Sequence, residues 1–64
     1  MFGAHKEEYT IDGKRYTVVA NFMAESMTVH GQGISSFTVP MKEYTDFEGN
    51  CEDWLTHILK ERNL

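Results

Sequence analysis

The residues able to bind a metal or act as nucleophiles are few: three histidines and one cysteine, His5, His30, His57 and Cys51. No two of them have a spacing typical of zinc ligands, such as C-x₂-C or H-x₃-H. Cys51 and His57 fall in a segment that we expect to be helical, and at about 100° per residue they point about 120° apart. The sequence therefore predicts no metal, no cofactor and no cysteine–histidine pair.

Other residue patterns also give no indication of a catalytic or phosphate-binding site. Asp53, His57 and Glu61 recur every fourth residue, which is typical of a solvated helix flank with pairs worth about 0.2–0.5 kcal/mol. Gly31-Gln32-Gly33 lacks the third glycine of a dinucleotide fingerprint and the Gly-Lys-Ser/Thr ending of a phosphate loop. No G-x-S-x-G nucleophile elbow is present, and 64 residues leave little room for a pocket that excludes water. We expect the chain not to be an enzyme.

Acidic residues are concentrated between positions 43 and 53, where no basic residue occurs. They are Glu43, Asp46, Glu48, Glu52 and Asp53, and the whole chain has a net charge of -4. One interpretation is a small acidic inhibitor or nucleic-acid mimic that binds a basic protein surface. The alternative is that Glu52 and Asp53 stabilise a helix N-terminus, while the other acids only keep a loop soluble.

In contrast, residues 26–41 contain no Asp, Glu, Lys or Arg. This stretch holds the expected third and fourth strands. Strands at the edge of a sheet are usually protected by charge, proline or a bulge. If the sheet is a meander, the fourth strand, expected at residues 34–39, lies at an edge with only Pro40 to protect it. The pattern predicts a docking edge for a second copy or for a partner's strand, unless another segment covers it or the strand is central.

The candidate interaction residues come from three places: this strand, the reverse face of the sheet, and the acidic segment. They are Ile34, Ser36, Phe37 and Thr38, then Val19 and Met23, then Glu43, Asp46 and Glu48. Val19 and Met23 could start a sheet-to-sheet contact, or they could belong to a solvated face.

Turn signals place the strands. Asp12-Gly13 predicts a type I′ hairpin that sets Tyr9 opposite Tyr16, with Val18 and Ala20 on the same face. A second turn at Ala24-Glu25 would set Phe22 opposite Met27 and Ala20 opposite Val29, although a longer loop is the alternative. Gly31-Gln32-Gly33 marks the next reversal.

The C-terminal part has helical signals. Met41, Tyr44 and Phe47 recur every third residue, which indicates a short helical turn or an ordered loop. Asn50 is a favourable N-cap for a helix that ends near Asn63. Its apolar stripe consists of Cys51, Leu55, Ile58 and Leu59, with Trp54 beside it. The expected fold is α+β: a four-stranded antiparallel meander with one C-terminal helix packed on one face.

Size and composition add further expectations. We expect one domain over residues 1–64, with residues 1–6 flexible. A core of this size rarely contributes more than about 3–5 kcal/mol, so pairing with a second copy would help. Cys51 is the only cysteine, which favours a reducing compartment. No apolar run reaches the roughly 18 residues that cross a membrane, and the N-terminus lacks a signal-peptide core, so we expect a cytoplasmic protein.

The predicted topology, if dimerised, resembles in outline the PC4-like single-stranded nucleic-acid binders, and Gly33-Ile34-Ser35 is similar to a string in that family. The resemblance implies binding on the open sheet face, with Lys14 and Arg15 at its rim. The chain lacks the basic residues and clustered aromatics of such a groove, which argues against nucleic acid as a partner. Our leading hypothesis is a non-enzymatic protein-interaction module, a homodimer that associates through the uncharged edge strand or sheet face.

Overall fold

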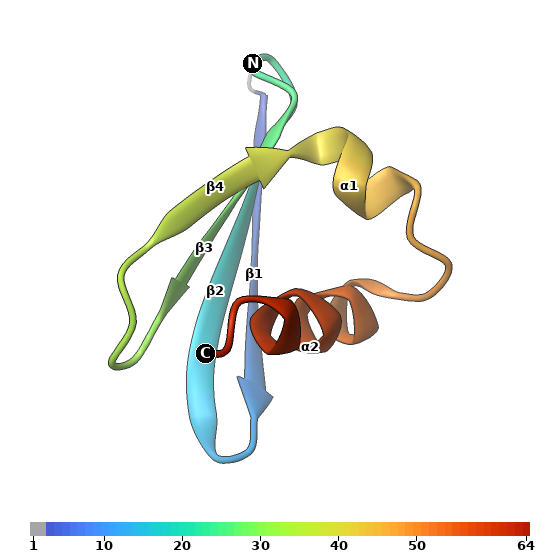
Figure 1. Ribbon diagram of the computed structural model, residues 1–64. Helices are drawn as coiled ribbons and strands as arrows, with labels where there is room; N and C mark the ends of the chain where they lie inside the picture. Colours follow the sequence, from blue (N-terminus) through green and yellow to red (C-terminus); the bar gives the residue numbers. More distant parts are fainter. Residues whose placement is uncertain (1–2) are drawn as a thin grey trace.

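The computed structural model describes residues 3–64 and confirms the α+β meander. Four strands, β1 (Ala4–Ile11), β2 (Lys14–Asn21), β3 (Ser26–Gly31) and β4 (Phe37–Pro40), pair in chain order. Two helices follow, α1 (Met41–Thr45) and α2 (Cys51–Glu61), as Figure 1 shows. Residues 4–6, which we expected in a flexible end, belong to β1. Residues 1 and 2 of that expected flexible end lie outside the described residues.

The first hairpin forms as its turn chemistry predicts. Ile11 pairs with Lys14, and Tyr9 pairs with Tyr16. Asp12 and Gly13 have φ angles of 52° and 77°, the left-handed conformation that a type I′ turn requires at both central positions. This turn fixes the register of β1 and therefore decides which of its side chains face the core.

The predicted register of the second hairpin is wrong. Ala20 pairs with Met27 rather than with Val29, and Phe22 has left the strand. The connection is a four-residue loop, residues 22–25, in which the Asn21 side chain accepts a hydrogen bond of 3.0 Å from the Ala24 N–H. Glu25 takes a left-handed φ of 54°. Because the shift is two residues, each side chain stays on its predicted face.

The fourth strand is shorter than predicted. It begins at Phe37, because residues 32–36 are needed to complete the reversal after β3. It also includes Pro40, the residue expected to protect this edge, which pairs with Ser26 and precedes α1. The next residue extends the backbone pairing between these two segments, since the Met41 N–H donates to the Glu25 carbonyl over 2.8 Å. Val39 is part of the buried core, and Phe37 is partly buried against it.

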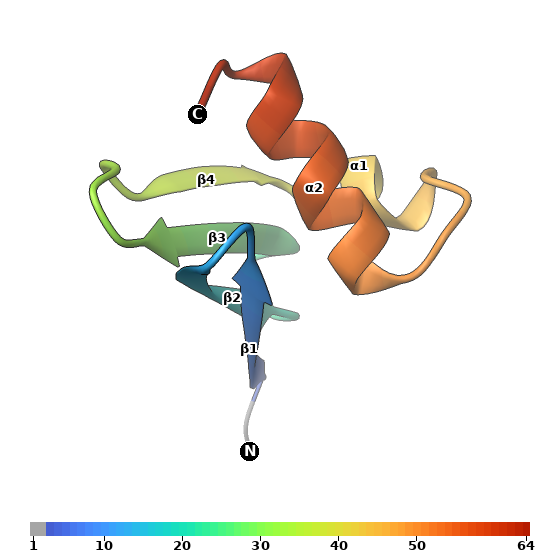
Figure 2. The same ribbon diagram turned by 90° about the horizontal axis from the view of Figure 1, so that it is seen from below.

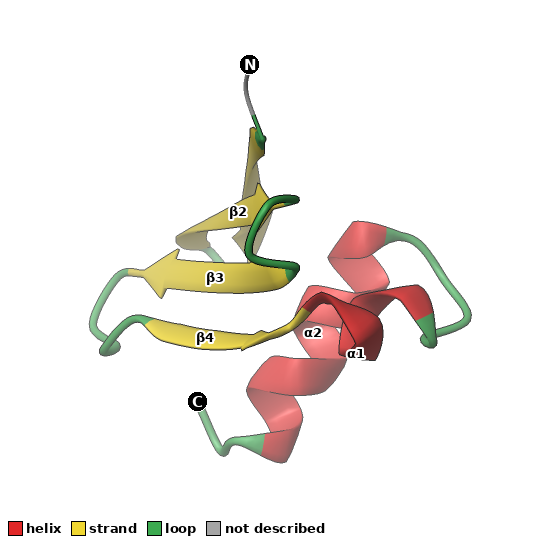
Figure 3. Cartoon of the chain, turned by 90° about the horizontal axis from the view of Figure 1, so that it is seen from above, coloured by secondary structure: helices red, strands yellow, loops and turns green. Residues whose placement is uncertain are grey.

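The two helices lie on the same side of the sheet, as Figures 2 and 3 show. The short helical turn expected after Pro40 is α1, a helix additional to the one in the predicted fold. The Asn50 side chain caps α2 by accepting a 2.8 Å hydrogen bond from the Asp53 N–H. Cap and helix position are therefore both as the sequence indicated, although Trp54, expected at the border of the apolar stripe, is only 2% exposed.

The core lies between α2 and the concave side of the sheet. Its strand residues are Tyr16, Val18, Ala20, Met27, Val29 and Val39, and its helix residues are Trp54, Leu55, Ile58 and Leu59. Tyr44 of α1 contacts Trp54 edge to face, with ring centroids 5.5 Å apart, which attaches the short helix to this core. Neither helix covers the reverse face of the sheet, so that face and both outer strands remain as candidate surfaces.

Candidate functional site

The sheet has two outer strands, and β1 and β4 each have one neighbour only. In an antiparallel sheet, residues on one strand alternate between bonding to one neighbour and pointing their backbone groups to the other side. The positions that bond inward therefore show which N–H and C=O groups an outer strand leaves free.

On β1 the odd-numbered residues bond to β2. The pair Ile11 and Lys14 flanks the two-residue turn, and the Phe22 N–H donates to the Gly3 carbonyl at the other end of the same ladder. The even-numbered residues then direct their backbone groups outward. They are Ala4, Lys6, Glu8 and Thr10, all exposed. This edge therefore offers four N–H donors and four carbonyl acceptors along an eight-residue strand.

On β4 the same reasoning gives a much smaller edge. The Met41 N–H bonds to Glu25, so the odd-numbered residues face β3. Thr38 and Pro40 are left to face outward, and proline has no N–H to donate. The charge-free edge predicted from the sequence does lie at the border of the sheet, but within β4 it offers the single N–H of Thr38.

The predicted contact residues of this region divide between two faces. Ile34 and Phe37 pack against the core instead of facing a partner. The Arg62 guanidinium also covers the Phe37 ring, at 4.1 Å from its centroid. Ser36 and Thr38 lie on the reverse face, where Ser36 bonds to His30 over 2.7 Å and Thr38 bonds to Thr28 over 2.9 Å.

The structure separates the two predicted residues of the reverse face. Val19 lies in β2 and is half-buried beside Thr28, its partner across the ladder. Met23, expected in a strand, lies in the loop between β2 and β3 with 86% of its surface exposed. The correction follows from the longer loop described above. Val19 therefore lies on the face of the sheet, and Met23 lies in the loop at its end.

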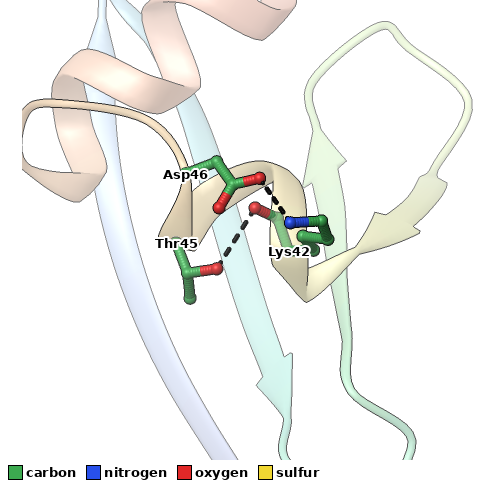
Figure 4. Close-up of polar contacts among 3 residues, drawn as sticks. All are labelled: Lys42, Thr45 and Asp46. Atoms are coloured by element: carbon green, nitrogen blue, oxygen red, sulfur yellow. Dashed lines mark hydrogen bonds and ion pairs between the residues drawn. The ribbon is translucent and has the colours of Figure 1, made fainter.

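The acidic segment forms part of a second surface. Glu43 and Asp46 line an open hollow of about 350 Å³ with Glu61 of α2, a residue that the sequence analysis did not place there. Asp46 accepts a 2.9 Å contact from Lys42, which raises the pKa of that exposed lysine, and the Thr45 hydroxyl donates to the Lys42 carbonyl (Figure 4). Glu48 does not line the hollow. The acids therefore converge only in part, and one is already paired.

His5 lines the same hollow as Cys51, whereas His30 bonds to Ser36 and His57 lines another hollow. Cys51 and His57 line different hollows on the two sides of α2. His57 contacts the Phe47 ring, with centroids 5.3 Å apart, and lies 3.5 Å from Glu61. Within residues 3–64 no three His, Cys, Asp or Glu side chains converge in a way that could hold a metal ion.

The sequence analysis missed a pocket between the N-terminal half of β1 and α1. Its volume is about 370 Å³, within the range of small-molecule pockets. Val18, Ala20 and Met27 lie at its apolar base, and the remaining described lining residues are His5, Glu7, Tyr9, Phe22, Met41, Tyr44, Thr45 and Cys51. Since five elements, β1, β2, β3, α1 and α2, contribute to it, no local sequence pattern could have indicated it.

Polar contacts organise one wall of this pocket. His5 Nε2 lies 2.6 Å from the Glu7 carboxylate. The pKa of the Tyr9 hydroxyl is raised above its ordinary value of 10.0, first by hydrogen bonding to Cys51, then by burial and by the charges of Cys51, Glu7 and Tyr44. The Tyr9 hydroxyl therefore holds its proton more strongly than that of a free tyrosine.

Two further observations concern the described chain as a whole. No helix within residues 3–64 is long and apolar enough to span a membrane. Among these residues no buried side-chain nitrogen or oxygen lacks a hydrogen-bond partner, so no unsatisfied polar atom marks a ligand site. Comparisons with family models, curated proteins and solved structures give no match, and the function must be argued from the geometry of this chain itself.

Proposed function

We propose that this chain is a non-enzymatic interaction module whose two copies join through their β1 edges into one continuous sheet. The observation that carries the proposal is the unpaired outer side of β1, with four outward N–H groups and four outward carbonyls. Strand addition at such an edge uses backbone hydrogen bonds for affinity and side chains for specificity. A small core gives the chain a reason to pair, because the dimer would bury additional surface.

The side chains of β1 favour one particular register. In an antiparallel pair centred on Glu7, Lys6 of one copy stands opposite Glu8 of the other. Two-fold symmetry repeats every contact, so two such opposite-charge pairs form. Each is worth about 0.2–1 kcal/mol. The two Glu7 side chains face each other across the axis, a like-charge pair that offsets part of this gain, and each also contacts His5 of its own strand at 2.6 Å.

Charge on an outer strand normally discourages pairing with other chains. Here Lys6 and Glu8 alternate along the free edge, so a second copy in this register meets opposite charge, while most other strands do not. The charges would then select the partner. The uncharged β4 edge, our expectation from the sequence, is the weaker candidate because of its single outward donor.

A charge-swap experiment tests the proposal, with the mass in solution measured by light scattering after size exclusion. Lys6→Glu should weaken the dimer by about fivefold or more, because two attractions become repulsions. Adding Glu8→Lys to the same chain should restore it, since the double variant has complementary edges and an unchanged net charge. A strictly monomeric wild-type protein at high micromolar concentration would refute the proposal.

Proline substitutions distinguish the two edges. Glu8→Pro removes an outward N–H of β1 without removing a bond to β2, and Thr38→Pro does the same for β4. We expect Glu8→Pro to give a folded monomer and Thr38→Pro to leave the dimer intact. The opposite result would assign the interface to β4 and overturn our choice.

A second candidate function rests on the acidic hollow, where Glu43, Asp46 and Glu61 converge on one side of α2. Such a surface would suit a basic protein partner. Replacing Glu43, Asp46 and Glu48 by Lys should abolish capture of a basic partner, and unchanged affinity would exclude the idea.

The acidic charge also leads us to expect no shift of a single-stranded oligonucleotide at low salt. A cytoplasmic location is part of the proposal, supported by the free Cys51 thiol.

A further inference from the structure

We propose that the pocket between β1 and α1 binds a small quaternary ammonium ion. Three aromatic side chains from separate elements line it: Tyr9 from β1, Phe22 from the loop after β2, and Tyr44 from α1. The faces of aromatic rings carry partial negative charge and attract cations, which is how aromatic cages recognise methylated ammonium groups. Two polarizable methionine side chains, Met27 and Met41, complete the apolar lining.

The charge of the pocket fits a cation. Glu7 is the acidic residue among its described lining residues, and those residues include no lysine or arginine. Its side chain is 49% exposed, so the carboxylate can face a ligand without first being taken out of water. An anionic ligand would be repelled by this carboxylate, whereas a cation gains from both the carboxylate and the rings.

The aromatic and apolar lining favours a cation without N–H groups. The Glu7 carboxylate contacts His5 through one oxygen, at 2.6 Å, and most of the other lining residues have apolar or aromatic side chains. A primary amine would need hydrogen-bond acceptors in place of the water that it loses. A quaternary ammonium ion makes no hydrogen bonds, so the rings and the nearby negative charge are sufficient for it. All these residues belong to one chain, and in the proposed dimer Glu7 would also face Glu7 of the second copy.

The methionine methyl groups provide a direct readout. Met27 and Met41 line the pocket, whereas Met23 is 86% exposed outside it and serves as an internal reference. We would titrate the protein with choline at pH 8 and follow these methyl resonances by carbon–proton NMR. Saturable shifts at Met27 and Met41, with none at Met23, are expected. The neutral compound of the same shape, 3,3-dimethylbutan-1-ol, should bind at least about fivefold more weakly. Equal binding of the two compounds would overturn the proposal.

Paired variants separate the pocket from the general negative charge of the chain. Glu7→Gln and Glu8→Gln remove the same charge from adjacent residues that face opposite sides of β1, and only Glu7 lines the pocket. Glu7→Gln should weaken choline binding by about fivefold, and Glu8→Gln should leave it nearly unchanged. Phe22→Leu should weaken it as well, and because Phe22 is 56% exposed in a loop, this variant should fold. Equal effects of the two glutamine variants, or no shift with wild-type protein, would refute the site.

Discussion

Truncating the side chain of Leu55 should leave a large fraction of the protein molecules unfolded. Leu55 lies on the face of α2 that packs against the sheet and is 0% exposed. Truncation of a fully buried leucine to alanine costs about 2–5 kcal/mol, the lost transfer free energy together with the cavity. A domain of this size has roughly 3–5 kcal/mol of net stability. The variant Leu55→Ala should therefore be partly unfolded at 25 °C.

The assay is urea and thermal unfolding at one fixed protein concentration, followed by circular dichroism and by the fluorescence of Trp54. The fixed concentration matters because dimer formation would itself stabilise the folded chain. At about 4–8 °C per kcal/mol, the midpoint of thermal unfolding should fall by at least roughly 8 °C.

Leu64→Ala is the matched control. It is the same chemical change at a residue that is 50% exposed, and it should shift the midpoint little. If Leu55→Ala costs no more than Leu64→Ala, the packing of α2 on the sheet is not what stabilises this fold.

The remaining predictions concern a cap, a close contact and a titration. Asn50→Ala removes the acceptor of the Asp53 N–H and should destabilise the protein by about 0.5–2 kcal/mol in urea unfolding, whereas Asn50→Asp should retain the cap. Gly31→Ala would place a Cβ 2.5 Å from the Tyr16 ring, so it should cost about 1–3 kcal/mol; an unchanged urea midpoint would argue against this contact. Because the pKa of Tyr9 is raised in the folded state, its contribution to stability is complete below about pH 10 and is lost as the pH rises through the folded-state pKa. Tyr9→Phe should therefore reduce the alkaline loss of stability, and identical pH profiles for the two proteins would contradict this reasoning.

Sequence reasoning succeeded where local chemistry determines the structure. Asp12-Gly13 sets the first hairpin because these residues tolerate left-handed φ angles, and Asn50 sets the start of α2 because its side chain bonds to the backbone three residues later. It failed at the second turn, where Glu25, an ordinary residue, adopts a left-handed φ that only the surrounding fold imposes. The assignment of side chains to the two faces of the sheet is still correct, because strand side chains alternate with a period of two and the register error is two residues.

The candidate surfaces were harder to predict, because they depend on tertiary structure. The absence of charge drew attention to β4, but the number of outward N–H groups depends on hydrogen-bond alternation and on where the strand begins. Ile34 and Phe37 are apolar and were expected to contact a partner. In the structure both pack against the core, and Arg62 covers the Phe37 ring. The pocket joins Glu7 to Tyr44 across the fold, a distance in sequence over which no periodic pattern extends.

The meander order has a kinetic consequence. Each strand pairs with its neighbour in the chain through a connection of two, four or five residues, so little loop entropy opposes each pairing. Folds built from such local contacts are among the faster to form, and single hairpins form in about 1–10 μs. The sheet can thus assemble hairpin by hairpin, while α2, which follows the strands in the chain, supplies Trp54 and Leu55 to the core. Until that helix docks, a nascent sheet would expose its apolar face to water, which makes the final eleven-residue helix the element that commits the chain to its native state.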